Sequence, residues 1–229
     1  MVSCQMIEVI ELFKSVQGEG PSCGQPALFV RLRRCQLRCS WCDSRFSWDS
    51  KDPDYTTYTT WDEKKLAYEL KSDAKGRIVV ITGGEPLIWK RQLVKMLSYL
   101  RRVPRIEIET NGTIPVGELA QCRNVYFNVS PKLSSSGNEG LKRINEEALR
   151  GFAYTYRAVF KFVVTSPLDI NEIEILERQR LSPIWVMPEG VTVESQIKGL
   201  KWLAPIAIQR NWSISLRLHI LAFGNRRRT

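Results

Sequence analysis

Three closely spaced cysteines, Cys35, Cys39 and Cys42, lie in the run CQLRCSWC. Iron–sulfur cubane clusters usually take four thiolates, so a group of three indicates a 4Fe-4S cluster with one iron left for a non-protein ligand. Such a cluster can do chemistry as well as carry electrons. The alternatives are a disulfide pair and a zinc site, although no further zinc ligand lies at a familiar finger spacing. The candidates for that fourth zinc ligand are Cys4, Cys23, Cys122 and His219.

The length and composition predict one α/β domain over residues 1–229, because 229 residues can bury a substantial single core. The N-terminal segment has no basic stretch followed by an apolar run, and no apolar run reaches membrane-spanning length. Six cysteines without an export signal favour a reducing compartment. We therefore expect a cytoplasmic protein with no membrane partner, in which Cys4, Cys23 and Cys122 are bystanders.

The formal net charge of +10 raises the question of nucleic-acid binding. The basic residues are spread along the chain, and no helix-turn-helix, zinc finger or RNA-binding motif accompanies them. We therefore expect no direct nucleic-acid partner, and a basic surface also suits an acidic electron-transfer protein or anionic small molecules. Two basic groups stand out, one beside the cysteines and one in a short C-terminal tail (224–229) that could simply be solvated. They are Arg31, Arg33, Arg34 and Arg38, and Arg226, Arg227 and Arg228.

Short apolar runs alternate with amphipathic segments, which predicts a mostly parallel sheet, either open or curled into a barrel, with helices outside. Thr60 and Glu63 have the spacing of a capping box and predict the start of the first helix. The expected strands are Ala27–Arg33, Arg77–Thr82, Arg105–Thr110, Asn124–Ser130, Val159–Val164, Ile184–Met187 and Ser213–His219. The expected helices are Trp61–Ser72, Lys90–Arg101, Leu141–Arg150, Ile170–Arg180 and Val193–Ala204.

Three short motifs follow three consecutive predicted strands. They are GGEP at 83–86, ETNG at 109–112 and SPK at 130–132. Each alone is typical of an ordinary turn. Chemistry in parallel α/β folds gathers at the C-terminal ends of the strands, however, and these motifs lie downstream of the cysteine run. Their joint placement therefore predicts one functional site.

Together with QGEG at 17–20, FVRL at 29–32 and WCDS at 41–44, these motifs resemble the 7-carboxy-7-deazaguanine synthases (QueE-type) of the radical S-adenosylmethionine superfamily. The resemblance runs from about Val9 to His219. It implies a partial TIM-like barrel, the radical SAM core, with the cofactors 4Fe-4S cluster, S-adenosyl-L-methionine (SAM) and Mg2+. The implied reaction is a carbon–nitrogen lyase step, the conversion of 6-carboxy-5,6,7,8-tetrahydropterin to 7-carboxy-7-deazaguanine with loss of ammonia, in queuosine and 7-deazaguanine biosynthesis.

The resemblance also implies roles for individual residues in a cluster loop at 35–44 and beyond. Cys35, Cys39 and Cys42 would hold the cluster, and Ser44 would bind magnesium, where many members have threonine. The implied SAM-binding residues are Gly84, Glu85, Ser130, Pro131 and Lys132. The implied substrate-binding residues are Val16, Gln17, Gly18, Glu19, Arg31, Thr82, Glu109 and His219.

Some points depart from the family pattern or stay open. His219 is the only histidine, and a half-buried histidine on a final strand is usually structural, although many members place one against the substrate. The tail AFGNRRRT differs from the short proline-ending tail of some members. The expected partners are a flavodoxin- or ferredoxin-like reductant and a second copy in a homodimer. The competing hypotheses are another radical SAM enzyme, such as a glycyl-radical activase, and a non-enzymatic metal-binding module.

Overall fold

The computed structural model describes residues 6–229, and a nine-stranded sheet forms its centre in the order β3-β1-β2-β4-β5-β6-β7-β8-β9. From β2 to β9 neighbouring strands run parallel, while β1 runs antiparallel to both β2 and β3. The predicted mostly parallel α/β fold is therefore confirmed. The strands are β1 (Ile7–Val16), β2 (Pro26–Leu32), β3 (Thr59–Trp61), β4 (Ile78–Gly83), β5 (Ile106–Thr110), β6 (Val125–Val129), β7 (Ala158–Val164), β8 (Ile184–Pro188) and β9 (Ser213–Ile214).

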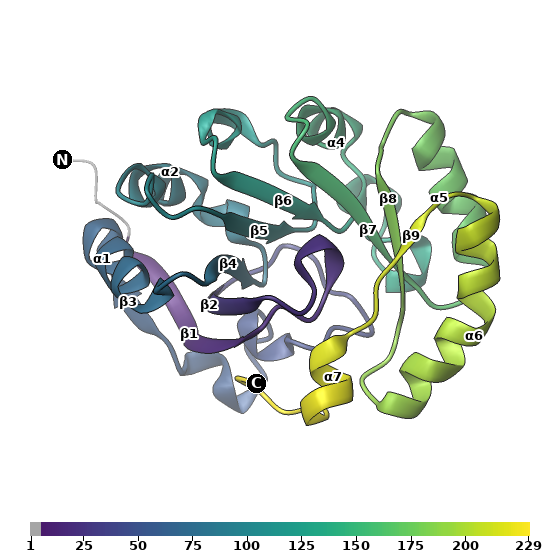
Figure 1. Cartoon of the computed structure of the whole chain (residues 1–229), viewed down its shortest axis with the longest axis horizontal. Coiled ribbons are helices and arrows are strands. Elements are labelled where there is room, and N and C mark those ends of the chain that lie inside the picture. The colour runs from purple at the N-terminus through teal and green to yellow at the C-terminus, as the bar shows by residue number, and fades with distance from the viewer. Residues whose placement is uncertain (1–5) are drawn as a thin grey trace.

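The helices lie outside the curved sheet, and the last one, α7, returns to the side where β1 and β2 lie (Figure 1). Two hydrogen bonds donated by backbone amides join these ends of the fold. Leu218 N donates to the Gly18 carbonyl (2.9 Å), and Gly20 N donates to Ser215 Oγ (2.9 Å). No helix among residues 6–229 has the length and apolar character to cross a membrane. The helices are α1 (Glu63–Ala74), α2 (Lys90–Ser98), α3 (Gly140–Arg143), α4 (Glu146–Ala153), α5 (Leu168–Arg178), α6 (Val193–Gln209) and α7 (Leu218–Phe223).

Each strand presents a different chemistry to its two faces, because successive side chains of a strand point to opposite sides of the sheet. In β5, Ile106 and Ile108 are fully buried in the apolar core that packs against the helices. Glu107 and Glu109 alternate with them and face the inside of the curved sheet, where they meet Gln17. The outer face therefore supplies the core, and the inner face is free to carry polar groups.

The sequence-based elements agree with the structure in most places. Every predicted strand except the last lies within one residue of an observed strand, and the predicted helices are found except as noted below. The predicted helix α6 ended before Pro205, but the helix continues through this proline to Gln209. The antiparallel strands β1 and β3 were not predicted.

Two predicted elements are wrong in their extent. The last strand was expected to run from Ser213 to His219, but β9 ends at Ile214 and His219 lies in the first turn of α7. The single helix expected at Leu141–Arg150 is two helices, α3 and α4, with a break at residues 144–145. The second helix, α4, begins after Asn145, because Asn145 Oδ1 accepts a hydrogen bond from Ala148 N (3.1 Å) and caps the helix.

The predicted capping box of the first helix is also wrong. Thr60 lies in β3 and pairs with Glu8 of β1, so it is not at the helix start. The cap is Asp62, whose Oδ1 accepts hydrogen bonds from Lys64 N (3.0 Å) and Lys65 N (3.1 Å). These two bonds satisfy amide groups that have no partner inside the helix.

This cap gives a matched pair of variants. Asp62→Ala should lower the free energy of unfolding by about 1 kcal/mol, because two helix amides lose their acceptor. Thr60→Ala removes a side chain that caps nothing and should have a clearly smaller effect. Urea unfolding of the two variants, followed by circular dichroism, measures both values. Equal losses would show that Asp62 does not cap α1.

Candidate active site

A cavity of about 270 Å³ opens where the strands of the curved sheet end. The cluster loop, the turn after β1 and the segment after β9 complete its walls. Nearly all of the residues singled out from the sequence line this one cavity, although they come from distant parts of the chain. They are Val16, Gln17, Gly18, Glu19, Arg31, Cys35, Cys39, Cys42, Ser44, Thr82, Gly84, Glu109, Ser130, Lys132 and His219.

The three cysteines of the cluster loop are unpaired thiols that line the cavity. Cys39 is buried and Cys35 is partly buried, and burial raises the pKa of Cys35 to about 12. A bound iron would displace the proton from such a thiol. Among the described residues, no three Cys, His, Asp or Glu side chains converge on a single metal ion. A cubane binds each thiolate through a different iron, so three thiols around one cavity fit a 4Fe-4S cluster.

The paired glycines at the end of β4 allow the cluster loop to come close. A side-chain carbon at Gly84 would lie 2.2 Å from the Arg34 carbonyl oxygen, and one at Gly83, where φ is +147°, would lie 2.1 Å from the Leu32 oxygen. Only glycine fits such contacts. Gly84 N and Glu85 N then donate to the Leu32 (3.1 Å) and Arg34 (2.7 Å) carbonyls. The chain just before Cys35 is held in place by these bonds.

Glu85 lies behind the cavity wall and does not line the cavity. Its side chain is fully buried and accepts three hydrogen bonds, from Leu87 N (2.9 Å), Thr110 Oγ1 (2.7 Å) and Asn111 N (2.7 Å). Burial raises the pKa of this carboxyl. The carboxylate therefore ties the loop after β4 to the end of β5. Pro131, the other expected SAM contact that does not line the cavity, is buried beside Lys132.

Lys132 places a cation at the cavity beside the cysteines. Its Nζ donates to both the carbonyl and the hydroxyl of Ser130, at 2.8 Å each. Burial lowers the pKa of this lysine. An anionic group that enters the cavity would stabilise the positive charge of Lys132 and oppose this lowering of its pKa.

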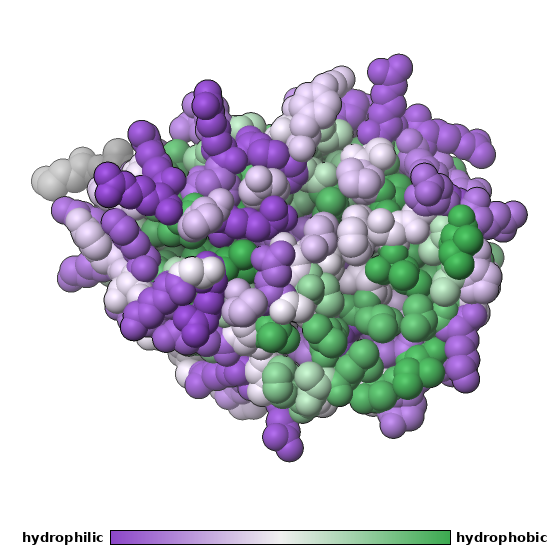
Figure 2. Space-filling model, in the orientation of Figure 1, coloured by the Kyte–Doolittle hydropathy of each residue, from purple (hydrophilic) through white to green (hydrophobic). Residues whose placement is uncertain are grey.

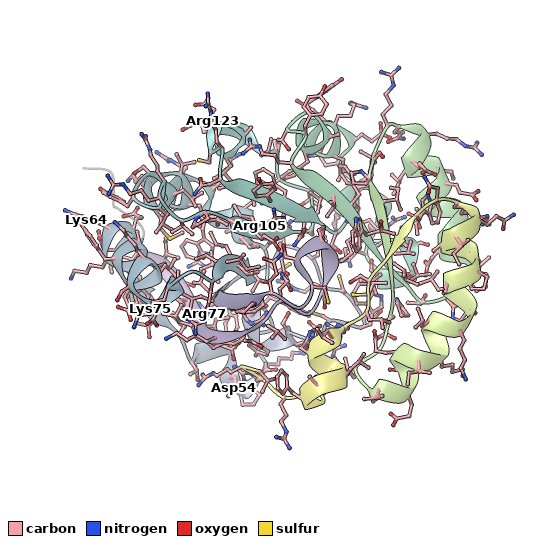
Figure 3. The ribbon with its side chains drawn as sticks, in the orientation of Figure 1. Asp54, Lys64, Lys75, Arg77, Arg105 and Arg123 are labelled. Carbon is pink, nitrogen blue, oxygen red and sulfur yellow. The ribbon has the colours of Figure 1, made fainter. Side chains whose placement is uncertain are left out.

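Gln17 connects the turn after β1 to two glutamates on the inner face of β5. Its Nε2 lies 3.1 Å from Glu109 Oε1 and 3.3 Å from Glu107 Oε2. Glu107 is fully buried and also accepts from Asn128 Nδ2 (2.9 Å) and from Arg105 Nε (2.7 Å), the residue labelled near the centre of Figure 3. Glu107 is thus a structural anchor, and Glu109 keeps lone pairs for a ligand.

Glu19 forms a largely buried charge cluster that no sequence motif predicts. Lys161 of β7 donates to one of its oxygens, and Arg217 Nε lies 3.0 Å from the other. Burial alone would raise the pKa of Glu19, but the two cations outweigh it and lower that pKa. Arg217 also pairs with Asp43, which lies between Cys42 and Ser44 in the cluster loop. A lone lysine inside the apolar run AVFKFVV was the signal available for Lys161.

The C-terminal tail is part of the cavity wall and is not simply solvated. Arg227 Nε lies 2.9 Å from Glu11 Oε1, and a second nitrogen of Arg227 pairs with Asp54, labelled beside the C-terminus in Figure 3. Glu11 is almost fully buried and also accepts from Arg31 Nε (2.8 Å). Burial would raise the pKa of Glu11, but Arg31 and Arg227 outweigh it and lower the pKa.

His219 lies directly over Gly18. A side-chain carbon at Gly18 would be 2.0 Å from His219 Nδ1, so the glycine is needed for space. Burial lowers the pKa of His219, which favours the neutral imidazole near pH 7. The histidine lines the cavity from α7 rather than from a strand. His219 therefore lies at the cavity, whereas the strand predicted for it is wrong.

The family model of the radical SAM superfamily matches residues 29–176. The 7-carboxy-7-deazaguanine synthase of Pyrobaculum aerophilum is 35% identical over 99% of both chains. That of Hyperthermus butylicus is 31% identical over 94% of this chain and 92% of its own.

The crystal structure of QueE from Escherichia coli superimposes with a TM-score of 0.71 at 26% identity, covering 93% of this chain and 95% of the other. Streptococcus suis SuiB shares the fold alone, with a TM-score of 0.56 at 15% identity over 80% of this chain and 48% of that chain. The chain belongs to the radical SAM superfamily and, within it, to the family of the 7-carboxy-7-deazaguanine synthases. Membership of the superfamily makes SAM and a 4Fe-4S cluster its cofactors.

The first prediction from this site concerns the cluster ligands. Cys42→Ala should abolish assembly of the cubane, because the site has no spare thiolate. Cys122→Ala is the matched control, since Cys122 is also a free thiol and lies outside the cavity. Iron and sulfide analysis after anaerobic reconstitution measures cluster content. A full cluster in Cys42→Ala would refute the assignment, and so would a full cluster in Cys35→Ala or Cys39→Ala.

The second prediction concerns Glu85. Glu85→Ala should destabilise the cluster-free protein by about 1–3 kcal/mol or more, because buried donors on Leu87, Thr110 and Asn111 lose their acceptor. Thermal and urea unfolding measure this change. If Glu85 served only as a contact to SAM, the variant would unfold like the parent protein and lose SAM affinity instead.

Proposed function

We propose that this protein converts 6-carboxy-5,6,7,8-tetrahydropterin to 7-carboxy-7-deazaguanine with loss of ammonia. One observation carries the proposal. The CxxxCxxC cysteines, Arg31 and the turn that contains Gln17 meet in one cavity. The chain is also similar over almost its whole length to proteins named for making this product. The names of the relatives support a role in 7-deazaguanine biosynthesis. The pterin substrate is the part that we add to it.

We assign different roles to the residues around the cavity according to their positions. Cys35, Cys39 and Cys42 would hold the cluster, and the Gly84 turn and Lys132 lie next to them to receive SAM. The cluster and SAM together supply a 5′-deoxyadenosyl radical when bound. The chain's own contribution is to position the substrate beside this radical and to exclude water.

The substrate would lie between the turn after β1 and the inner face of the sheet. Glu109 can accept two parallel N–H bonds from the guanidine-like edge of a pterin, and Gln17 orients it. Arg31 uses its Nε for Glu11, which leaves its terminal nitrogens for a carboxylate or carbonyl of the substrate. Thr82 lies directly beside Arg31 in the register of β2 and β4 and extends the same wall. His219 and Gly18 close the far side.

Ser44 is the residue that we propose for magnesium. It lies at the cavity two residues after Cys42, and its Oγ is 3.7 Å from the Cys42 sulfur. Magnesium keeps several waters and binds few protein groups, so one hydroxyl together with a substrate carboxylate is a suitable set. The ion would orient the substrate and stabilise negative charge on it.

The two competing functions are less well supported. A glycyl-radical activase would need the cysteines and the GGEP turn, but not the polar set formed by Gln17, Glu109 and Arg31 in this cavity. A metal-binding module without activity would not need a cavity of this size beside its metal. Neither hypothesis predicts that the protein converts a pterin to another compound.

The proposal is tested with full-length protein reconstituted anaerobically with iron and sulfide. The protein is incubated with dithionite, SAM, Mg2+ and 6-carboxytetrahydropterin, and mass spectrometry follows the products. We expect 7-carboxy-7-deazaguanine and ammonia in equal amounts, with turnover that depends on Mg2+ and falls in Ser44→Ala. SAM cleavage without any deazaguanine product would overturn the assigned substrate while leaving the superfamily intact.

Arg31→Lys separates substrate binding from SAM binding. A lysine keeps the charge opposite Glu11 but loses the planar fork, so the KM for the pterin should rise by about tenfold, as for loss of a bidentate contact. Substrate-independent SAM cleavage, measured as deoxyadenosine release, should persist. Unchanged pterin binding with lost SAM cleavage would place Arg31 on the cofactor side of the cavity.

The partners remain predictions that suit the surface of the protein. We propose an acidic flavodoxin- or ferredoxin-like reductant, because the chain carries a net charge of +10.

We also propose a homodimer in the cytoplasm. Apolar side chains gather on one face over α6 and α7 (Figure 2). Ile197 and Ile208 of α6 and Phe223 of α7 are exposed, and light scattering measures whether a second copy of the chain covers them.

A further inference from the structure

Each cysteine of the cluster loop has an N–H donor from another part of the chain beside its sulfur. Trp48 Nε1 lies 3.2 Å from Cys42 Sγ, and Asn138 Nδ2 lies 3.3 Å from Cys39 Sγ. Asn111 Nδ2 is 4.0 Å from Cys35 Sγ and makes the weakest of the three contacts. None of these donors belongs to the CxxxCxxC run.

The orientation of the Asn138 amide is fixed by its other contacts. Its Oδ1 accepts a hydrogen bond from the backbone amide of Arg38 (2.8 Å), which only an oxygen can do. The nitrogen of the amide must then face Cys39, and it also lies 3.1 Å from Ser136 Oγ. The donor to Cys39 is thus built into the fold.

Trp48 is also held in one position. The Arg38 guanidinium lies 4.6 Å from the centre of the Trp48 ring, and an Arg38 nitrogen donates to the Leu37 carbonyl (2.9 Å). The stacking holds the indole against the cluster loop. An indole nitrogen can only donate, so its contact with Cys42 can only be an N–H···S hydrogen bond.

We infer that Trp48 and Asn138 set the reduction potential of the cluster. When the cluster accepts one electron from a low-potential reductant, negative charge on its thiolates increases. An N–H donor stabilises the more negative state more strongly, so each donor raises the potential. The inference rests on the cluster assignment alone and not on the proposed substrate.

Trp48→Phe is the test variant, because phenylalanine keeps a ring for Arg38 to stack on and removes only the donor. Trp212→Phe is the matched control. It removes another buried indole donor, which lies 2.9 Å from Glu177 Oε1 and outside the cavity. Both full-length variants are reconstituted anaerobically and titrated with dithionite and redox mediators. Electron paramagnetic resonance then reports the reduced cluster, without SAM or pterin.

At a fixed potential, Trp48→Phe should lower the ratio of reduced to oxidised cluster by about threefold, since the redox equilibrium feels only the part of the hydrogen-bond energy by which the bond to the reduced cluster is stronger. Threefold corresponds to about 28 mV, because a tenfold change equals 59 mV for one electron. The control should keep the parent potential. A potential unchanged in Trp48→Phe would overturn the role of the indole.

Asn138→Asp gives a second, independent measurement. The aspartate keeps an oxygen for the Arg38 amide but replaces the donor at Cys39 with a second acceptor. Its potential should therefore fall further than that of Trp48→Phe. An unchanged potential would overturn the role of Asn138, and failure of both variants to assemble a cluster would show that the donors serve assembly and not tuning. None of these outcomes depends on whether the protein makes 7-carboxy-7-deazaguanine.

Discussion

The largely buried carboxylate of Glu19 holds together parts of the site that are far apart in the chain. It accepts from Lys161 of β7 and from Arg217 after β9, and Arg217 in turn pairs with Asp43 of the cluster loop. Removing one partner of a buried ion pair typically costs about 3–5 kcal/mol, because a charge is left without compensation. The turn after β1 and the cluster loop are therefore tied to each other through Glu19 and Arg217.

The curved sheet makes such charges possible. Its outer face buries aliphatic side chains against the helices and supplies the stability, whereas its inner face carries groups that are costly to bury, such as Glu107 and Lys161. Each cost is offset locally, because Glu107 accepts from Gln17, Asn128 and Arg105. The inner face therefore presents fixed charges to whatever enters the cavity.

The sequence predicts much of the fold because β-branched and aromatic runs alternate with amphipathic ones, and this pattern determines the parallel strands. It does not predict β1 and β3 as antiparallel partners, or that β9 is short, because pairing with distant strands decides these points. Local motifs identify the cysteines and Gly84. Arg217 and Trp48 belong to no motif, and only the folded chain brings them to Glu19 and Cys42. Glu85 is predicted at the cavity but lies behind the cavity wall, where its carboxylate accepts hydrogen bonds from Thr110 and Asn111.

The contact between Gly18 and His219 has a consequence for how this site can evolve. A methyl group at position 18 would clash with the imidazole, because its carbon would lie only 2.0 Å from His219 Nδ1. The glycine is therefore fixed for as long as the histidine is present, and a smaller residue at position 219 has to be accepted before position 18 becomes free to vary. Two sites 201 positions apart in the chain thus form one epistatic pair, in which the order of substitutions determines which of them survive selection.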